Sequence, residues 1–277
     1  MKKKLILVLI LLVLLVGVFI YIAPKFSRLW RENSASQNVD LPAAKNYQEF
    51  VTSTKEEIKN EVKPDEEQPE EDVVIKAVFD SEIAQTRGEI KNINLNVPFT
   101  SQAPSANWEQ PYQDACEEAS FLMLDYYYQN KKFGSATDTE KLINTLVDWQ
   151  VANWGAHANL PVQELKKLVG ENSTYRVELV YDLTAEKIKN ILQTGQPLIV
   201  PANGKKLANP NFKNGGPEYH MLVIKGYVDD KFITNDPGTR LGADFIYTSE
   251  NLLDSIADWD TLSKKADGPK TGIIIRK

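Results

Sequence analysis

The pattern of apolar and polar positions begins with a long apolar run. Leu5 to Ala23 contains no charged residue, and a helix over this range, at about 1.5 Å per residue, nearly spans a bilayer core of about 30 Å. Three lysines precede the run at positions 2–4, and basic residues at such a flank tend to stay in the cytoplasm. The pattern therefore predicts a membrane anchor over residues 1–23, with the rest of the chain outside the cell.

The same segment does not have the pattern of a cleaved signal peptide. Such a peptide has a shorter apolar region that is followed closely by a small-x-small cleavage site. Here Pro24 and Lys25 follow the run, and the nearest such site, at 34–36, lies well downstream. We therefore expect a single-pass, uncleaved signal-anchor, so the membrane is a predicted partner of the N-terminal helix.

A polar segment over residues 24–89 is expected to form a stalk. From Asp40 to Val62 apolar residues recur at intervals of three and four, which predicts a solvated amphipathic helix. The acidic stretch Lys63–Val74 contains two prolines and predicts an extended, self-repelling spacer. The helix is suited to a stalk or to self-association, so the oligomeric state stays open.

The chain from about Ile90 has the composition of a folded domain, predicted over residues 90–277. Helical patterns come first, and short β-rich runs follow the last of them. The predicted helices are Ala115–Gln129, Asp138–Asp148, Leu160–Val169 and Thr184–Gly195, and the predicted strands are 197–202, 219–227, 231–236 and 244–248. Helices followed by strands, without regular alternation, indicate an α+β domain.

Charge and cysteine content narrow the classes of function. The net charge is −6 and no basic block lies outside the membrane flank, which argues against a nucleic-acid partner. Cys116 is the single cysteine, so the chain forms no internal disulfide. Cys116, His157 and His220 lack the short spacings of a zinc site, and we expect no metal and no other cofactor.

Cys116 lies where an apolar helix is predicted to begin. Asp114 fits the N-cap and Glu117 fits its capping-box partner, which places Cys116 in the first turn. The helix dipole favours a thiolate there, whereas Glu117 and Glu118 oppose it. A nucleophile at this position therefore needs a base. The alternative is a core cysteine, because Cys116 lies on the apolar side of the helix.

The two histidines are the candidate bases. His157 lies in the loop "NWGAHANLP", where a solvated or hydrogen-bonded side chain is expected. His220 opens the strand "YHMLVIKGY", and Asp236 ends "KFITND". A chain reversal about Val228 would set His220 directly opposite Asp236 on one sheet face, with Cβ atoms about 4.5–5.5 Å apart. A turn centred between residues 229 and 230 would instead set Asp236 on the other face, and the local sequence leaves both turns open.

Two segments, Leu95–Met123 and Gly215–Thr239, resemble the C39-like peptidases, which are papain-fold cysteine peptidases of bacterial envelope proteins. The resemblance extends from Ile90 to the C-terminus. It implies a papain-like fold in which N-terminal helices pack on a C-terminal antiparallel sheet. It also implies that Cys116 is the nucleophile, His220 the general base and Asp236 the residue that orients the base.

The resemblance further implies a glutamine that donates to the oxyanion from a position upstream of the cysteine. Gln102 follows the strand-like "NVPFTS", as the glutamine of the family does, and is the preferred candidate. Gln110 and Gln113 are the alternatives, and Gln110 has the spacing of the transporter-linked branch. The chain has no Walker A motif, so a leader-processing exporter is not expected.

The function implied by this resemblance is that of a membrane-anchored, extracellular cysteine peptidase that hydrolyses bonds in a peptide or protein. Trp108, Tyr112 and Trp154 are candidates for lining a substrate cleft, although such rings are as often core lids. The same triad would serve a cell-wall amidase or acyl transferase. The competing class is a non-catalytic surface module that binds a peptide or a wall polymer.

Overall fold

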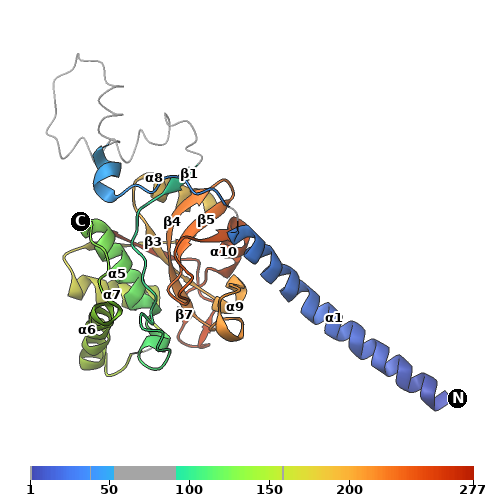
Figure 1. Cartoon of the computed structure of the whole chain (residues 1–277). Coiled ribbons are helices and arrows are strands. Elements are labelled where there is room, and N and C mark those ends of the chain that lie inside the picture. Colours follow the sequence, from blue (N-terminus) through green and yellow to red (C-terminus); the bar gives the residue numbers. More distant parts are fainter. Residues whose placement is uncertain (1, 38, 53–91, 158) are drawn as a thin grey trace.

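A computed structural model describes residues 2–37, 39–52, 92–157 and 159–277. Figure 1 shows the long helix α1 (Lys2–Ser36) projecting from a domain in which helices pack beside an antiparallel sheet. α1 is long and apolar enough to cross a membrane, by length and composition. The predicted α+β class, with one apolar helix at the N-terminus, is confirmed.

The main sheet has seven strands, all paired antiparallel. Six of them follow the order β2-β9-β3-β4-β5-β6, and β1 pairs with the second half of β4. Their bounds are β1 Asn92–Asn94, β2 Arg176–Val180, β3 Leu198–Ala202, β4 His220–Val228, β5 Lys231–Asn235, β6 Phe245–Thr248 and β9 Gly272–Arg276. A separate hairpin is formed by β7 (Trp259–Asp260) and β8 (Lys265–Ala266). β4 is buried along its whole length, which explains its nearly unbroken apolar sequence.

Three helices between β1 and β2 form the helical layer of the domain (Figure 1). They are α5 (Cys116–Gln129), α6 (Ala136–Trp154) and α7 (Val162–Asn172). The helices α8 (Ala185–Gln193), α9 (Gly204–Leu207) and α10 (Ser249–Ser255) lie between later strands. α5 packs on β4 and is buried on nearly every side. This contact brings the first residue of α5 close to the first residue of β4.

The start of α5 differs from the predicted capping box. Asp114 ends a short 3₁₀ helix, Tyr112–Asp114, and the N-cap of α5 is Ala115, which has no side-chain cap. Cys116 is therefore the first residue of α5. The Glu117 side chain turns into the interior instead of capping the helix, so the predicted cap was wrong.

The hairpin between β4 and β5 decides whether the candidate histidine and aspartate can meet. Val228 pairs with Lys231, so the turn consists of Asp229 and Asp230. Asp229 has a positive φ of 53°, which aspartate tolerates better than most residues. The chain reversal about Val228 was therefore wrong, and the alternative turn is the observed one.

A β-bulge between Ile224 and Gly226 changes this register by one residue. A one-residue shift moves side chains to the other face of a sheet, so the bulge undoes the change of face that the turn would cause. Asp236 follows β5, and continuation of the shifted register places it opposite Leu222, two residues from His220 and on the same face. Such diagonal neighbours lie within reach of long side chains.

Part of the segment that was expected to be a stalk contacts the domain. The Glu32 carboxylate is buried and accepts hydrogen bonds from the Thr248 N–H and hydroxyl, at 3.1 and 3.0 Å. The Lys45 N–H donates to the Asn94 carbonyl, at 3.0 Å. Figure 1 shows the end of α1 beside α10.

Only the beginning of the predicted helix Asp40–Val62 lies in the described part of the chain. Residues 47–52 are helical, and 53–62 lie outside the described residues, as does the predicted spacer Lys63–Val74. Tyr47 packs edge-on against Tyr128, and Phe50 is buried. The described part of this helix is therefore packed on the domain and is not solvated as predicted.

Candidate active site

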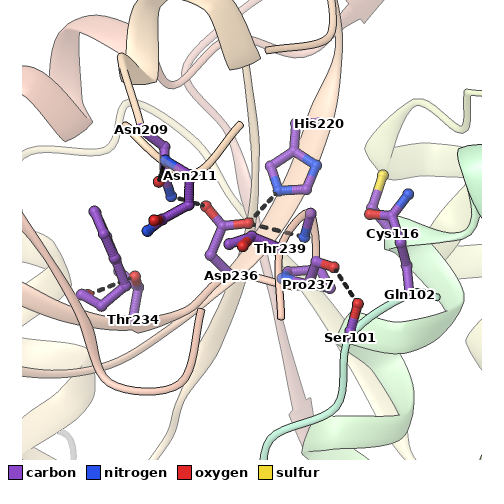
Figure 2. A network of polar contacts seen from close by, with 12 residues as sticks. Ser101, Gln102, Cys116, Asn209, Asn211, His220, Thr234, Asp236, Pro237 and Thr239 are labelled. Atoms are coloured by element: carbon purple, nitrogen blue, oxygen red, sulfur yellow. Dashed lines mark hydrogen bonds and ion pairs between the residues drawn. The ribbon is translucent and has the colours of Figure 1, made fainter. Parts of the chain in front are cut away.

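The candidate residues come from both layers of the domain. Cys116 begins α5 in the helical layer, His220 begins β4, and Asp236 directly follows β5. The His220 Nε2 atom lies 2.7 Å from Asp236 Oδ1. Figure 2 shows the second ring nitrogen of His220 on the side of Cys116, so the imidazole lies between the carboxylate and the thiol in this view.

Asp236 is fully buried and all its acceptor positions are used. Oδ1 accepts from the Gly238 N–H at 3.0 Å in addition to its bond with His220. Oδ2 accepts from the Tyr247 hydroxyl at 2.6 Å and from Asn209 Nδ2 at 3.1 Å. Burial alone would raise the pKa of Asp236, but His220 and these donors outweigh it and hold the pKa below its usual value. Asp236 is therefore an ionised partner for the imidazole.

The His220 ring is also fixed by its packing. The Phe212 ring contacts it edge-on, with centroids 5.3 Å apart. Gly238 approaches so closely that an added Cβ would lie 2.8 Å from His220 Cε1. A larger residue at position 238 would displace the imidazole, so glycine is required there.

The Cys116 thiol is hydrogen-bonded to the carboxyl group of Glu117. Cys116 is 4% exposed, and its Sγ donates to Glu117 Oε2 at 3.0 Å. No hydrogen bond joins Cys116 to His220 in the described part of the chain. Burial raises the pKa of the Cys116 thiol well above its usual value, and the charge of Glu117 adds to the effect.

The carboxyl group of Glu117 is one of two buried acids behind the thiol. Its Oε1 accepts from the Leu160 N–H at 2.9 Å. Burial, with the neighbouring charge of Glu118, raises the pKa of Glu117 to about 8.

Glu118, the second buried acid, pairs with His157: its Oε1 lies 3.4 Å from His157 Nε2. Burial opposes a charge on His157, but Glu118 outweighs it, and the pKa of His157 is raised. Of the two alternatives expected for His157, solvated or hydrogen-bonded, the second fits, because only 5% of its side chain is exposed and it pairs with Glu118.

The three candidate glutamines differ in where their side chains lie. Gln102 is buried, and its Nε2 donates to the carbonyls of Tyr112 and Gln113, at 3.0 and 2.8 Å. Figure 2 shows Gln102 beside Cys116. Gln110 and Gln113 are exposed, and the Gln110 amide donates to Asp114, at 2.6 Å. The structure therefore brings only the preferred glutamine to the cysteine.

The segment that carries Gln102 is also tied to the loop that carries Asp236. The Gln102 N–H donates to the Pro237 carbonyl at 3.0 Å, and the Ser101 hydroxyl donates to the same oxygen at 3.2 Å. These bonds join the helical layer to the sheet layer beside the site (Figure 2).

Comparison with known families agrees with this geometry. The model of the Peptidase_C39 like family matches residues 94–267, which is more than half of the chain and includes Cys116, His220 and Asp236. The chain belongs to the peptidase C39-like family. Membership indicates a cysteine-peptidase fold and a peptide or protein as the class of substrate.

Solved structures similar to this C39-like chain include one from a bacterium. It is a crystal structure of a Bacillus anthracis protein that is provisionally described as a C39-like peptidase. The two share 16% sequence identity with a TM-score of 0.44, and the match covers 67% of this chain and 98% of the other. No curated protein matches the chain.

The aromatic residues proposed for a cleft do not form one group in the C39-like domain. Trp108 is 38% exposed. Tyr112 is buried, and its hydroxyl accepts from Asn144 Nδ2 at 3.0 Å. Trp154 packs edge-on against Trp149, with centroids 5.1 Å apart. Of the three, only Trp108 presents an open ring.

Sequence reasoning missed the residues that support Asp236. Asn209 lies in the loop after α9 and Tyr247 lies on β6, and both reach Asp236 Oδ2. No motif or spacing connects either residue to the aspartate. A tyrosine among the apolar residues of a predicted strand was the available signal, since a buried hydroxyl needs a partner. Among the described residues, no group of three or more His, Cys, Asp and Glu side chains is arranged to hold a metal ion.

Proposed function

We propose that this C39-like protein is a membrane-anchored, extracellular cysteine peptidase with a papain-like arrangement and a Cys116–His220–Asp236 triad. The observation that carries the proposal is the His220–Asp236 bond of 2.7 Å, formed beside a cysteine at the start of the central helix. Figure 2 shows His220 between Asp236 and Cys116, and this arrangement supports the roles proposed for the three residues.

Asp236 accepts a hydrogen bond from the N–H of His220 Nε2, which leaves Nδ1 to take the proton of Cys116. The thiolate then attacks the substrate carbonyl carbon and forms a tetrahedral intermediate. When this collapses, the C–N bond breaks and His220 gives its proton to the leaving amine. Water attacks the resulting thioester, with His220 as the base, and releases the acid and the free thiol.

The developing oxyanion lies at the start of α5, where helix N–H groups have no partner within the helix. Gln102 is the side-chain donor proposed for it, because its side chain is buried beside Cys116 (Figure 2). Both amide hydrogens of Gln102 bond to the carbonyls of Tyr112 and Gln113, so one of these bonds must break when the amide donates to the oxyanion. Loss of one such donor typically costs about 2.7–4 kcal/mol of transition-state stabilisation. Trp108 is proposed to contact the substrate, because its ring is open to solvent.

Membrane anchorage is part of the same proposal. α1 contains the apolar run, and the lysines at positions 2–4 favour a cytoplasmic N-terminus. Protease added to intact cells should remove the domain, while protein from untreated cells keeps Met1. A mature N-terminus near residue 37 would instead show a cleaved and secreted protein.

A second candidate is a non-catalytic module that binds a peptide or a wall polymer. The observation that favours it is the thiol itself, which is buried and bonded to Glu117 instead of His220. An amidase or acyl transferase would use the same triad with another acyl acceptor or substrate.

A thiol-reactive probe on the folded full-length protein tests the proposal. Labelling at Cys116 should depend on His220, so the His220→Ala variant should label far more slowly, and Cys116→Ser should not label. Hydrolysis of a peptide library should show the same dependence. A thiol that reacts only after unfolding, together with no hydrolysis, would assign the protein to the non-catalytic class. Transfer of the acyl group to an added amine would identify a transferase.

A further inference from the structure

A second polar group touches the sulfur of Cys116. Glu117 Oε2 lies 3.0 Å from Sγ, and the other oxygen of this carboxyl group accepts the Leu160 N–H, at 2.9 Å. Glu117 is 1% exposed. No lysine, arginine or histidine forms an ion pair with Glu117 in the described ranges of the chain. Backbone N–H groups and the thiol itself are therefore what stabilises a negative charge on this carboxyl group, without a cationic partner among the described residues.

We propose that Glu117 is a further catalytic residue of the proposed peptidase and acts in its protonated form, donating a hydrogen bond to the Cys116 thiolate that is lost when Glu117 ionises. This inference rests on the proposed function. It assigns two donors to the thiolate, the imidazolium of His220 and the carboxyl O–H of Glu117. An ionised Glu117 would repel the same thiolate at a distance of about one hydrogen bond.

The observed contact suits either position of one proton. A thiol that donates to a carboxylate and a carboxylic acid that donates to a thiolate both bring Sγ and Oε2 to hydrogen-bond distance. A neutral acid is the cheaper of the two forms for Glu117 because no cation offsets its burial. The geometry is therefore ready to support a thiolate once His220 has taken the thiol proton.

Neighbouring charges oppose ionisation of Glu117. On α5, Glu118 raises the pKa of Glu117, and burial is the larger cause. On the loop before α7, His157 faces Glu118 and partly offsets that charge. On the sheet side, Tyr219 donates to the Leu160 carbonyl and to Asp258, which adds another acid to the surroundings.

On the same side His220 faces the sulfur, and its imidazolium is the one cation proposed beside the pair (Figure 2). When the pH rises, two protons move. Glu117 releases one proton to water, and His220 returns its proton to Cys116. The thiolate, imidazolium and carboxylic acid become a thiol, an imidazole and a carboxylate. The thiolate fraction therefore falls as the pH rises, which is the opposite of the behaviour of an ordinary cysteine.

The experiment follows Cys116 in the full-length protein in detergent from pH 5 to pH 10. Thiolate absorbance and the rate of alkylation by iodoacetamide, a neutral reagent, are measured together. Both should fall across a transition near pH 8, the pKa of Glu117 being raised to about 8. The rate should drop about tenfold per pH unit above the transition. In Glu117→Gln the fall should disappear, so the variant should react about tenfold faster than the wild type at pH 9.

Glu118→Gln is the matched control. It also removes a buried carboxylate from the first turn of α5, but one that contacts Gln150 and His157 and not the sulfur. Because Glu118 raises the pKa of Glu117, this variant should move the fall to a lower pH. Opposite changes from two adjacent glutamates would not arise from a general loss of packing.

A fall that persists unchanged in Glu117→Gln would overturn this inference and leave the peptidase proposal intact. Failure of Cys116 to react at any pH would instead overturn the peptidase proposal. If Glu117→Gln does not fold, the pH dependence of the thiolate signal in the wild type tests the inference by itself. A thiolate signal that only rises with pH contradicts the inference. A fall accompanied by loss of an infrared band of a protonated carboxyl group supports it.

Discussion

Two buried carboxyl groups flank the Cys116–His220 pair, and they are held in opposite states. Asp236 receives four donors, from His220, Gly238, Asn209 and Tyr247. Glu117 receives hydrogen bonds from backbone N–H groups and the thiol, and it faces Glu118. The pKa of Asp236 is lowered, whereas that of Glu117 is raised to about 8.

The difference shows that burial alone does not decide the charge of an acid. Both groups lose their hydration, which raises the pKa in each case. Donors to the carboxylate then reverse the shift at Asp236, and they are too few at Glu117. The sheet side of the site, at Asp236, therefore stabilises a negative charge, whereas the helix side, at Glu117, disfavours one.

The largest effect is expected from removing the base on the sheet side. His220→Ala should lower kcat/KM by about 10⁴- to 10⁶-fold, by analogy with removal of the base from a serine peptidase. The measurement is peptide hydrolysis, with thermal unfolding as the check on folding. Added imidazole should restore part of the activity. A loss below tenfold would show that His220 is not the base.

Asp236→Asn should lower turnover by less than the roughly 10⁴-fold known for serine enzymes, since an amide can still accept from the imidazole. The double variant with His220→Ala should be no worse than His220→Ala alone, because residues that act as one unit are not additive. Steady-state kinetics on the four proteins of this cycle provide the test. Additive losses would show that Asp236 acts on the loop that follows it and not through the histidine.

The helix side should show its effect in the dependence of stability on pH. The folded state keeps the proton of Glu117 between its ordinary pKa of 4.5 and about 8, whereas the unfolded state does not. The free energy of unfolding should therefore fall as the pH rises through this window, by up to a few kcal/mol at about 1.4 kcal/mol per pKa unit.

Urea unfolding of Glu117→Gln, measured from pH 4 to pH 9, should lack this fall. Glu171→Gln removes an exposed carboxyl group from α7 and should behave as the wild type does. If both variants follow the wild type, Glu117 is ionised in the folded protein at neutral pH, and the contrast with Asp236 is lost.

The smallest of these effects should come from one donor to Asp236. Tyr247→Phe removes a buried hydroxyl that donates at 2.6 Å, and we expect a loss of about 1.5–3 kcal/mol in the free energy of unfolding. The lowered pKa of Asp236 stabilises the fold above its ordinary value, and this is lost as the pH falls through the lower folded value. Acid unfolding should therefore begin at a higher pH in the variant. Tyr181→Phe, at an exposed tyrosine, should leave it unchanged.

Local patterns predicted much of the domain because they report which face of an element is buried. The central helix, its cysteine, and strands β3 to β6 were all visible in this way. β2 and β9 were not predicted. They pair with each other, although about 90 residues of chain separate them, and no local pattern reports such a pairing.

The meeting of His220 and Asp236 was predicted for the wrong geometric reason. The turn at residues 229–230 would have separated them, and the bulge at Lys225 returns them to one face. The side chain of Lys225 is buried and pairs with Asp244, which directly precedes β6. A bulge of this kind depends on contacts between strands, so the sequence of either strand alone does not reveal it.

The attachment of α1 to the domain determines how the site is carried above the proposed membrane. A flexible linker would let the domain move away from the membrane by about 5–6 Å times the square root of the number of linker residues. Here Glu32 is bonded to β6 and Arg28 to Asn251 of α10, so the helix acts as a strut. Because these contacts begin at Arg28, only residues 24–27 of the helix separate the apolar run from the domain, a standoff of about 6 Å. The proposed peptidase would then diffuse laterally with its active site at a constant distance from the membrane surface. Substrate bonds at other distances from the membrane would not reach the active site.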